Sequence, residues 1–178
     1  MAIDYGYKVF LGPIETCYAH SYRKMRNDPR VYRWCRQNNL ITDLQQEEWI
    51  KKISFDPSIR MYTIWTHHST SHGVELVGVC GLTSIDLINK RAEFSCYIDP
   101  DHQKKGFAKD ALKALFKYGF EEMNLNIIWG ETFSDNHAQH LFEKMGMVKE
   151  GVRRDFYFKA GKYCDAILYS IKRTEITW

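Results

Sequence analysis

The 178-residue chain lacks the long apolar segments that mark membrane-embedded and secreted proteins. No apolar run approaches the roughly 20 residues of a membrane-spanning helix. Residues 1–5, Met-Ala-Ile-Asp-Tyr, have neither the basic start nor the apolar stretch of a signal peptide. We therefore expect a cytoplasmic protein with no membrane partner.

Cysteine is too sparse and too scattered for cross-links or a metal site. The five cysteines are odd in number and show no Cys-x-x-Cys spacing, so the sequence predicts neither a disulfide framework nor a zinc site. His67, His68 and His72 lie close together in a polar stretch, but no carboxylate or thiol stands at ligand spacing from them. We expect an ordinary exposed turn there, and no metal.

A strong charge of either sign is also absent. Lys and Arg total 25 against 22 Asp and Glu, which leaves a net charge of +3, too small to indicate a nucleic-acid partner. With 44% hydrophobic and 26% charged residues, the composition is typical of a soluble globular protein. The length suits one folding unit, so we expect a single domain over residues 1–178.

The chain does contain a regular succession of strand and helix signals. Strands are predicted at 7–11, 61–66, 75–82, 91–98 and 127–132, and then as a hairpin of 147–158 with 163–171. Helices are predicted after Pro13, after Pro29, from a capping box at Thr42–Gln45, over 108–120, and from a cap at Ser134, Asp135 or Asn136 to Gly146. This order predicts an α+β fold with a mixed, mostly antiparallel sheet and helices on both faces.

Residues 91–108 carry the most informative motif, a strand that runs through a short basic turn into a helix. Pro100 stops the strand, and Gln103-x-x-Gly106-x-Ala108 supplies small residues where backbone must approach a ligand closely. Free N–H groups at a helix start bind a diphosphate well. The turn lacks the Gly-Lys-Ser/Thr of a P-loop and two of the three glycines of a dinucleotide fingerprint. It predicts a diphosphate cradle, although an ordinary strand–turn–helix junction would also contain such residues.

Residues 103–108 resemble the acyl-CoA signature Gln/Arg-x-x-Gly-x-Gly/Ala of the GNAT superfamily of N-acetyltransferases. Further segments resemble one branch of that superfamily, which holds ribosomal-protein N-terminal, spermidine and pseudaminic-acid-pathway nucleotide-sugar acetyltransferases. The matching segments are Arg26-Asn-Asp-Pro-Arg-Val-Tyr-Arg-Trp34 (RNDPxVxxW), Gly78-Val-Cys-Gly-Leu82 with Asn89-Lys-Arg-Ala-Glu-Phe94 (GxxGL…NxRAE), Ala138-x-x-x-Phe142-Glu-Lys-x-Gly146 (AxxxYEKxGF), and Glu150-Gly151 with Gly161-Lys-Tyr-x-Asp165.

This resemblance implies the GNAT fold, in which the strand at 91–98 splays from the strand at 127–132. It also implies acetyl-CoA as acyl donor and direct transfer of acetyl to a primary amine in a ternary complex. The acceptor expected first is a nucleotide-linked amino sugar or another small amine. Acetylation of a peptide N-terminus, as in the ribosomal-protein enzymes, and a non-catalytic acyl-CoA-binding domain remain alternatives, and monomer and homodimer are both open.

Glu93 is the candidate general base. Side chains alternate between the two faces of a strand, so Glu93 shares a face with Ser95 and Tyr97. Its carboxylate could therefore face the amine, and burial would raise its pKa toward a useful range. The alternative is a carboxylate paired with Lys90 or Arg91 on an exposed face. By resemblance, a backbone N–H near Tyr97 or Ile98 would polarise the thioester carbonyl, which makes Glu93 and Tyr97 the expected catalytic residues.

Two residues depart from the family pattern. Phe142 stands where the family usually has the tyrosine that protonates the leaving thiolate, and a phenyl ring cannot do so. Tyr157, Ser134 or a water would have to stand in, or the thiolate would leave unaided, since a thiol has a reference pKa of ~8.5. Lys104 replaces a more usual glycine in the cradle, which motivates the non-catalytic alternative.

The remaining expected site residues divide between donor and acceptor. The donor residues expected from the resemblance are Tyr97, Ile98, Gln103, Lys104, Lys105, Gly106, Phe107, Ala108, Asn136 and Phe142. The acceptor wall is expected among Arg30, Tyr32, Arg33, Trp34, Trp49 and Tyr157, with Arg30, Trp34 and Tyr157 first. Arginines would suit an anionic acceptor, whereas a polyamine would call for inward carboxylates among Glu15, Asp43, Glu47 and Glu48.

Overall fold

The computed structural model describes residues 2–67 and 73–178. The expected histidine turn lies outside these residues at His68 and His72, and the described His67 places Nε2 3.3 Å from an Asp4 carboxylate oxygen. Across the two described ranges, none of the helices has the length and apolar character needed to cross a membrane. In the same ranges, no group of three His, Cys, Asp or Glu residues is arranged to hold a metal ion.

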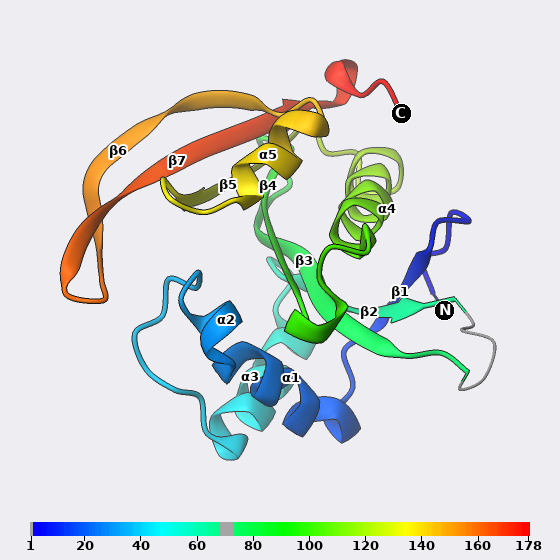
Figure 1. Cartoon of the computed structure of the whole chain (residues 1–178). Helices are drawn as coiled ribbons and strands as arrows, with labels where there is room; N and C mark the ends of the chain where they lie inside the picture. The colour runs from blue at the N-terminus through cyan, green and yellow to red at the C-terminus, as the bar shows by residue number, and fades with distance from the viewer. Residues whose placement is uncertain (1, 68–72) are drawn as a thin grey trace.

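The described strands form a seven-stranded sheet in the order β1-β2-β3-β4-β5-β7-β6 (Figure 1). The strands are β1 (Val9–Pro13), β2 (Arg60–Thr66), β3 (Leu76–Asp86), β4 (Arg91–Ile98), β5 (Ile127–Phe133), β6 (Val148–Lys159) and β7 (Lys162–Lys172). Every neighbouring pair is antiparallel except β4 with β5, which is parallel. The predicted mixed, mostly antiparallel sheet is confirmed.

Five α-helices connect the described strands, and most of them begin where local signals predict. They are α1 (Ala19–Asn27), α2 (Pro29–Tyr32), α3 (Asp43–Phe55), α4 (Phe107–Glu121) and α5 (Ala138–Lys144). The capping box of α3 is present, with Thr42 Oγ1 accepting from the Gln45 N–H and the Gln45 side chain turned back to the Thr42 N–H. The chain after Pro13 forms only a short 3-10 turn, Thr16–Tyr18, before α1 begins.

Of the three residues predicted to cap α5, Asn136 makes the expected contact: its Oδ1 accepts a hydrogen bond from the Ala138 N–H at 3.0 Å. Neither Ser134 nor Asp135 does so. Ser134 donates its backbone N–H to the Asp165 carbonyl of β7, so it still belongs to the sheet when the chain begins to turn. The helix therefore begins only after Asn136, the last of the three candidates, and Gly146 follows its end with φ +81°.

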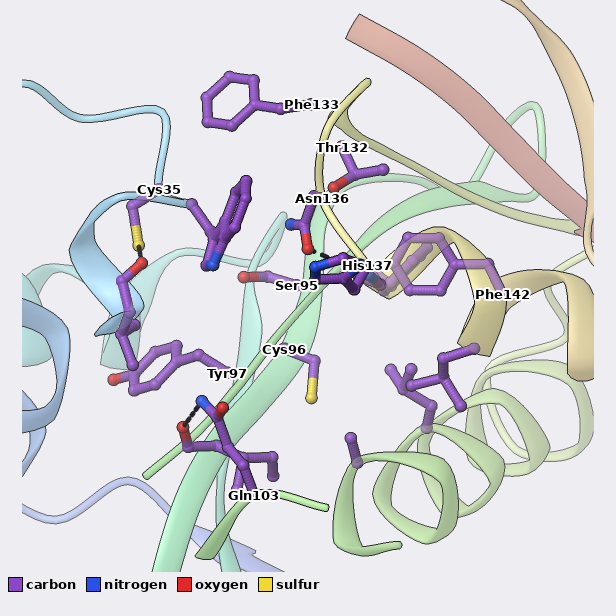
Figure 2. A pocket seen from close by; sticks show the side chains of 18 of the residues that line it. Cys35, Ser95, Cys96, Tyr97, Gln103, Thr132, Phe133, Asn136, His137 and Phe142 are labelled. Carbon is purple, nitrogen blue, oxygen red and sulfur yellow. Dashed lines mark hydrogen bonds between the residues drawn. The ribbon is translucent and has the colours of Figure 1, made fainter. Parts of the chain in front are cut away.

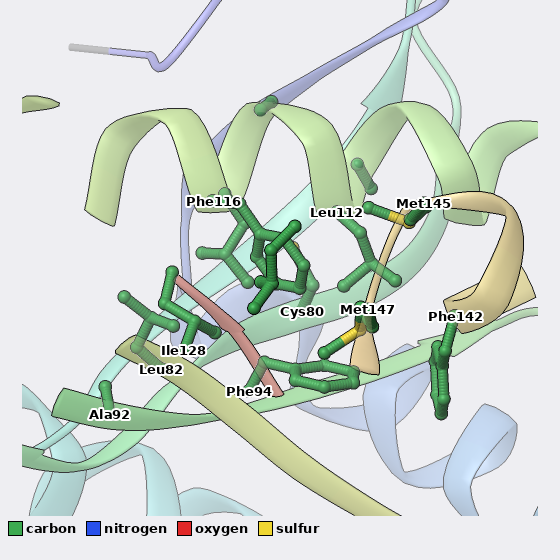
Figure 3. Packing of buried hydrophobic residues seen from close by; sticks show 14 of the residues in the cluster. Cys80, Leu82, Ala92, Phe94, Leu112, Phe116, Ile128, Phe142, Met145 and Met147 are labelled. Carbon is green, nitrogen blue, oxygen red and sulfur yellow. The ribbon is translucent and has the colours of Figure 1, made fainter. Parts of the chain in front are cut away.

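Alternation along β4 separates two apolar layers, one on each face of the sheet. Ala92, Phe94 and Ile98 point into a cluster shared with α4 and α5 (Figure 3). Tyr97 points the other way, against a smaller cluster that includes Tyr22 of α1 and α3 residues. Figure 1 likewise shows α1, α2 and α3 gathered on one side of β4 and α4 on the other. Helices on both faces are confirmed.

The parallel pair β4 and β5 is joined only at its start. Arg91, Ala92 and Glu93 pair with Ile127, Ile128 and Trp129, and no pairing continues beyond them in these described strands. The Phe94 ring lies where the two strands diverge and is called the aromatic wedge below. It is so close to Gly130 that a Cβ on this residue would come within 2.8 Å of Phe94 Cδ1. The ring occupies the space that a side chain on β5 would need at this position. Because backbone pairing ends at Glu93 and Trp129, the predicted splay of the two strands is confirmed.

Candidate active site

A cleft of about 600 Å³ opens where β4 and β5 separate (Figure 2). Its walls come from β4, the turn and first residues of α4, β5, the start of α5, α2 with the segment after it, and Tyr157 of β6. Nearly all of the predicted site residues line this one cleft, namely Glu93, Tyr97, Ile98, Gln103, Lys104, Gly106, Phe107, Ala108, Asn136, Phe142, Arg30, Trp34 and Tyr157. Lys105 does not; it lines a separate hollow beside His102 and Lys8.

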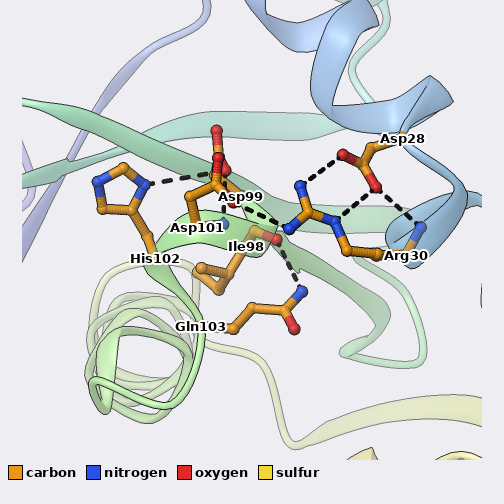
Figure 4. Close-up of polar contacts among 7 residues, drawn as sticks. All are labelled: Asp28, Arg30, Ile98, Asp99, Asp101, His102 and Gln103. Atoms are coloured by element: carbon orange, nitrogen blue, oxygen red, sulfur yellow. Dashed lines mark hydrogen bonds and ion pairs between the residues drawn. The ribbon is translucent and has the colours of Figure 1, made fainter.

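One end of the cleft is the turn that leads into α4. Lys104 and Gly106 both have positive φ, +63° and +88°, so the glycine serves a backbone conformation that other residues adopt at a cost. Lys104 adopts a left-handed backbone conformation at the position where the family pattern has glycine. The Gln103 side chain donates to the Ile98 carbonyl at 3.2 Å and ties the turn to β4 (Figure 4).

The helix start offers unpaired donors at this end. The first N–H of α4 to find a helical partner is that of Asp110, which donates to the Gly106 carbonyl. The N–H groups of the preceding residues are therefore free to bind an anion, and the helix dipole favours negative charge there. Phe107, Ala108 and Lys109 line the cleft at this point, so the residues present fit the diphosphate of an acyl-CoA.

The free edge of β4 runs along the middle of the cleft. Asp99 donates its N–H to Val77 of β3 at 2.8 Å, and the register of β3 with β4 continues without a shift from Ile98 to Glu93. Because hydrogen-bonding directions alternate in an antiparallel pair, Tyr97 also turns its N–H toward β3. The N–H groups of Cys96 and Ile98 consequently face the cleft, so Ile98 is the better placed of the two predicted donors.

At the opposite end Glu93 is buried, with 7% of its surface exposed. Its carboxylate pairs with neither Lys90 nor Arg91; Arg91 instead contacts Asp86. The partner of Glu93 is Arg36, whose Nη2 lies 2.8 Å from Glu93 Oε1. Burial, opposed by Arg36, raises the pKa of Glu93 above its ordinary value.

Glu131 and Arg36 complete this end of the cleft and were missed by the sequence analysis. The Glu131 side chain is 3% exposed and contacts Arg36 at 3.0 Å and Arg153 at 3.1 Å, and the Tyr157 hydroxyl donates to it. A lone glutamate inside the apolar strand segment 127–133 was an available signal for Glu131. Arg36 lies in an irregular segment with no motif, and nothing local marks it.

The predicted acceptor residues have mixed placements. Trp34 lines the cleft with Arg33 stacked on it at 4.4 Å. Arg30 lines it too, but its guanidinium binds Asp28 and Asp101 (Figure 4). The remaining wall candidates, Tyr32, Arg33 and Trp49, and the four carboxylates proposed for a polyamine, Glu15, Asp43, Glu47 and Glu48, are not among the residues that line the cleft.

Phe142 faces the cleft from α5 as part of an aromatic stack. Its ring meets Phe94 edge-to-face at 5.1 Å and Tyr169 at 5.5 Å, and it is almost fully buried. Of the two side chains offered as substitute acids, Tyr157 lines the cleft but is bonded to Glu131, and Ser134 is not among the lining residues. Phe142 therefore packs against the core, and its side chain offers no proton to the leaving thiolate.

Comparisons with known proteins agree with this geometry. A family model described as an acetyltransferase (GNAT) domain matches residues 8–148. The chain is 34% identical over 154 residues to the uncharacterized N-acetyltransferase p20 of Bacillus licheniformis, covering 84% of each protein. It is 37% identical over 98 residues to the uncharacterized N-acetyltransferase YoaA of Bacillus subtilis, covering 54% of this chain and about half, 55%, of that protein.

The same fold occurs in a solved structure of the spermidine N-acetyltransferase from Vibrio cholerae in complex with CoA and spermine. The TM-score is 0.87 at 25% sequence identity, covering 94% of this chain and 97% of that one. Family model, sequence relatives and fold all point to the same group. The chain therefore belongs to the GNAT acetyltransferase family, the N-acetyltransferases that use acetyl-CoA as donor.

Proposed function

We propose that the chain transfers the acetyl group of acetyl-CoA directly to the primary amine of a small molecule. The observation that carries this proposal is the position of Glu93, a buried carboxylate facing one end of a cleft whose other end is an anion-binding helix start. Donor and acceptor would meet along the free edge of β4 between them. Holding both in one cleft supplies the proximity that makes direct attack effective.

Each chemical step has a candidate group. The Ile98 N–H, which points into the cleft, would donate to the thioester oxygen as negative charge develops on it. The amine nitrogen forms a bond to the acetyl carbon, and its proton passes to Glu93 directly or through a water. The carbon–sulfur bond then breaks and the electron pair leaves with the CoA thiolate. With Phe142 in place of an acid, that thiolate takes its proton from solvent.

The contacts at the acceptor end favour a small molecule over a protein N-terminus. Lys159 at the tip of the β6–β7 hairpin donates to the Gln37 carbonyl, and Asn38 donates to the Phe158 carbonyl at 3.4 Å. These contacts join the hairpin to the segment after α2, so a peptide chain could not pass between the two. A peptide substrate would require them to open.

The charges at this end favour an acceptor with a single amino group. The two buried carboxylates, Glu93 and Glu131, are matched by Arg36 and Arg153, so the site is close to neutral overall. Arg30 is already bound by two carboxylates and offers little to an anionic nucleotide. A polyamine such as spermidine is the second candidate, supported by the likeness to the Vibrio cholerae enzyme crystallised with CoA and spermine.

The test is mass-spectrometric detection of acetylated product from acetyl-CoA and a panel of monoamines, UDP-linked amino sugars, polyamines and short peptides. We expect product from a small amine, and a fall of about 10²- to 10⁴-fold in turnover for Glu93→Gln, the range of general-base effects. Acetylation of peptides alone would contradict the small-molecule proposal. Binding of acetyl-CoA without any turnover would favour a non-catalytic domain.

A further inference from the structure

Arg36 connects three parts of the chain at the point where β4 and β5 separate. It lies between α2 and α3, and its guanidinium contacts Glu93 of β4 at 2.8 Å and Glu131 of β5 at 3.0 Å. Backbone pairing of β4 with β5 ends at Glu93 and Trp129. Beyond that point no backbone hydrogen bonds connect the two described strands, and the Arg36 guanidinium connects them instead by contacting one side chain from each.

The two carboxylates depend on Arg36 to different extents. Glu131 has further partners in Arg153 and the Tyr157 hydroxyl. Within the described ranges, Arg36 is the only hydrogen-bond or ion-pair partner of the Glu93 side chain. A buried carboxylate with one partner is free to move or to take up a proton once that partner is lost. The position and protonation of Glu93 should therefore depend on Arg36 more strongly than those of Glu131 do.

We propose that Arg36 is a positioning residue that holds the Glu93 carboxylate toward the cleft and sets the pH above which Glu93 can act as a base. This inference rests on the proposed function, because it assigns Arg36 to the base of that reaction. Arg36 is 48% exposed at its side chain, so it can form or break the contact without unfolding its surroundings. It acts on the reaction only through Glu93.

The charges that face Glu93 act in opposite directions. From β5 the Glu131 carboxylate opposes its ionisation, whereas Arg36 and, more weakly, Arg153 of β6 favour it. Burial adds to the effect of Glu131 and is the largest influence raising the pKa of Glu93. Burial lowers the pKa of Arg36, but Glu93, Tyr157 and Glu131 outweigh it and raise that pKa overall, so Arg36 stays charged. Removing Arg36 and removing Glu131 should thus shift the pKa of Glu93 in opposite directions.

The experiment is a titration of the Glu93 side chain by ¹³C NMR of the carboxyl carbons, in the full chain without substrates. Glu93→Gln assigns the signal. Arg36→Met should shift the midpoint upward by about one to three pH units, the usual effect of one nearby opposite charge. Arg36→Lys keeps the positive charge, so its midpoint should lie close to that of the wild type. Glu131→Gln should move the midpoint below that of the wild type.

Arg153→Met is the matched control, since Arg153 contacts Glu131 but not Glu93; its shift should be smaller than that of Arg36→Met. The acidic limb of the kcat/KM profile should move with the NMR midpoint. An unchanged midpoint in Arg36→Met, or equal shifts in Arg36→Met and Arg153→Met, would overturn the role of Arg36. A midpoint that shifts while the kinetic limb stays in place would instead overturn Glu93 as the base. If Arg36→Met does not fold, Arg36→Gln, which also removes the charge, takes its place and is judged by the same criteria.

Discussion

Replacing Gly106 with alanine tests whether the turn before α4 is a donor-binding cradle or an ordinary helix start. Gly106 has φ +88°, and an added Cβ would meet nothing nearer than Lys8 Nζ at 3.6 Å. The methyl group therefore has room in the free protein, and the change acts through the backbone. Gly161 at the tip of the β6–β7 hairpin has φ +80° and open space around its Cβ, so Gly161→Ala is a control with the same backbone cost far from the cradle.

The expected loss of stability is similar for the two variants. An alanine in the left-handed region costs about 1–2 kcal/mol, and its lower freedom in the unfolded chain returns about 0.4–1 kcal/mol. The net loss of about 1 kcal/mol corresponds to a fall in Tm of roughly 2–4 °C for a protein of this size. Thermal unfolding of the free proteins should show this fall for Gly106→Ala and Gly161→Ala alike.

Donor binding should separate the two variants. At Gly106 the methyl group stands on a residue that lines the cleft, and relief of the strained φ would rotate a peptide N–H away from the phosphates. Loss of one charge-assisted hydrogen bond is worth about 1.5–3 kcal/mol, so calorimetry should show acetyl-CoA affinity at least about tenfold weaker. Gly161→Ala should bind as the wild type does. Equal affinity in both variants would refute the cradle.

Three further predictions concern the aromatic wedge, the missing acid and the α5 cap. Gly130→Ala should lower unfolding stability by about 1–3 kcal/mol, because its Cβ would displace the Phe94 ring; Gly151→Ala, with open space around its Cβ, is the control, and equal denaturant midpoints would contradict the wedge. Phe142→Tyr should change kcat by less than about threefold, since a thiol of pKa ~8.5 leaves without an acid; a tenfold rise in steady-state rate would show that thiolate protonation limits turnover. Asn136→Ala should lower stability by about 1 kcal/mol through loss of the cap, and an unchanged Tm would remove that role.

Structural signals that span few residues were interpreted correctly from the sequence. The capping box of α3, the strand at 91–98 and the turn before α4 all depend on contacts within a few positions along the chain. The cap of α5 was left open among three residues, because it depends on where β5 ends and Ser134 is still bonded to β7 at that point. Side-chain preference alone could not show how far the sheet extends.

The sequence by itself determined the family, the order of the elements and the turn before α4 at one end of the cleft, because those depend on neighbouring residues. Only the tertiary structure decided the opposite end, around Glu93. Arg36 and Glu131 are 95 positions apart, and they meet because the splay of β4 from β5 leaves room for a guanidinium between two strands. At the point where the two strands separate, the Phe94 ring packs against Gly130. Contacts of this kind arise from how distant surfaces pack, so no local pattern in the chain records them.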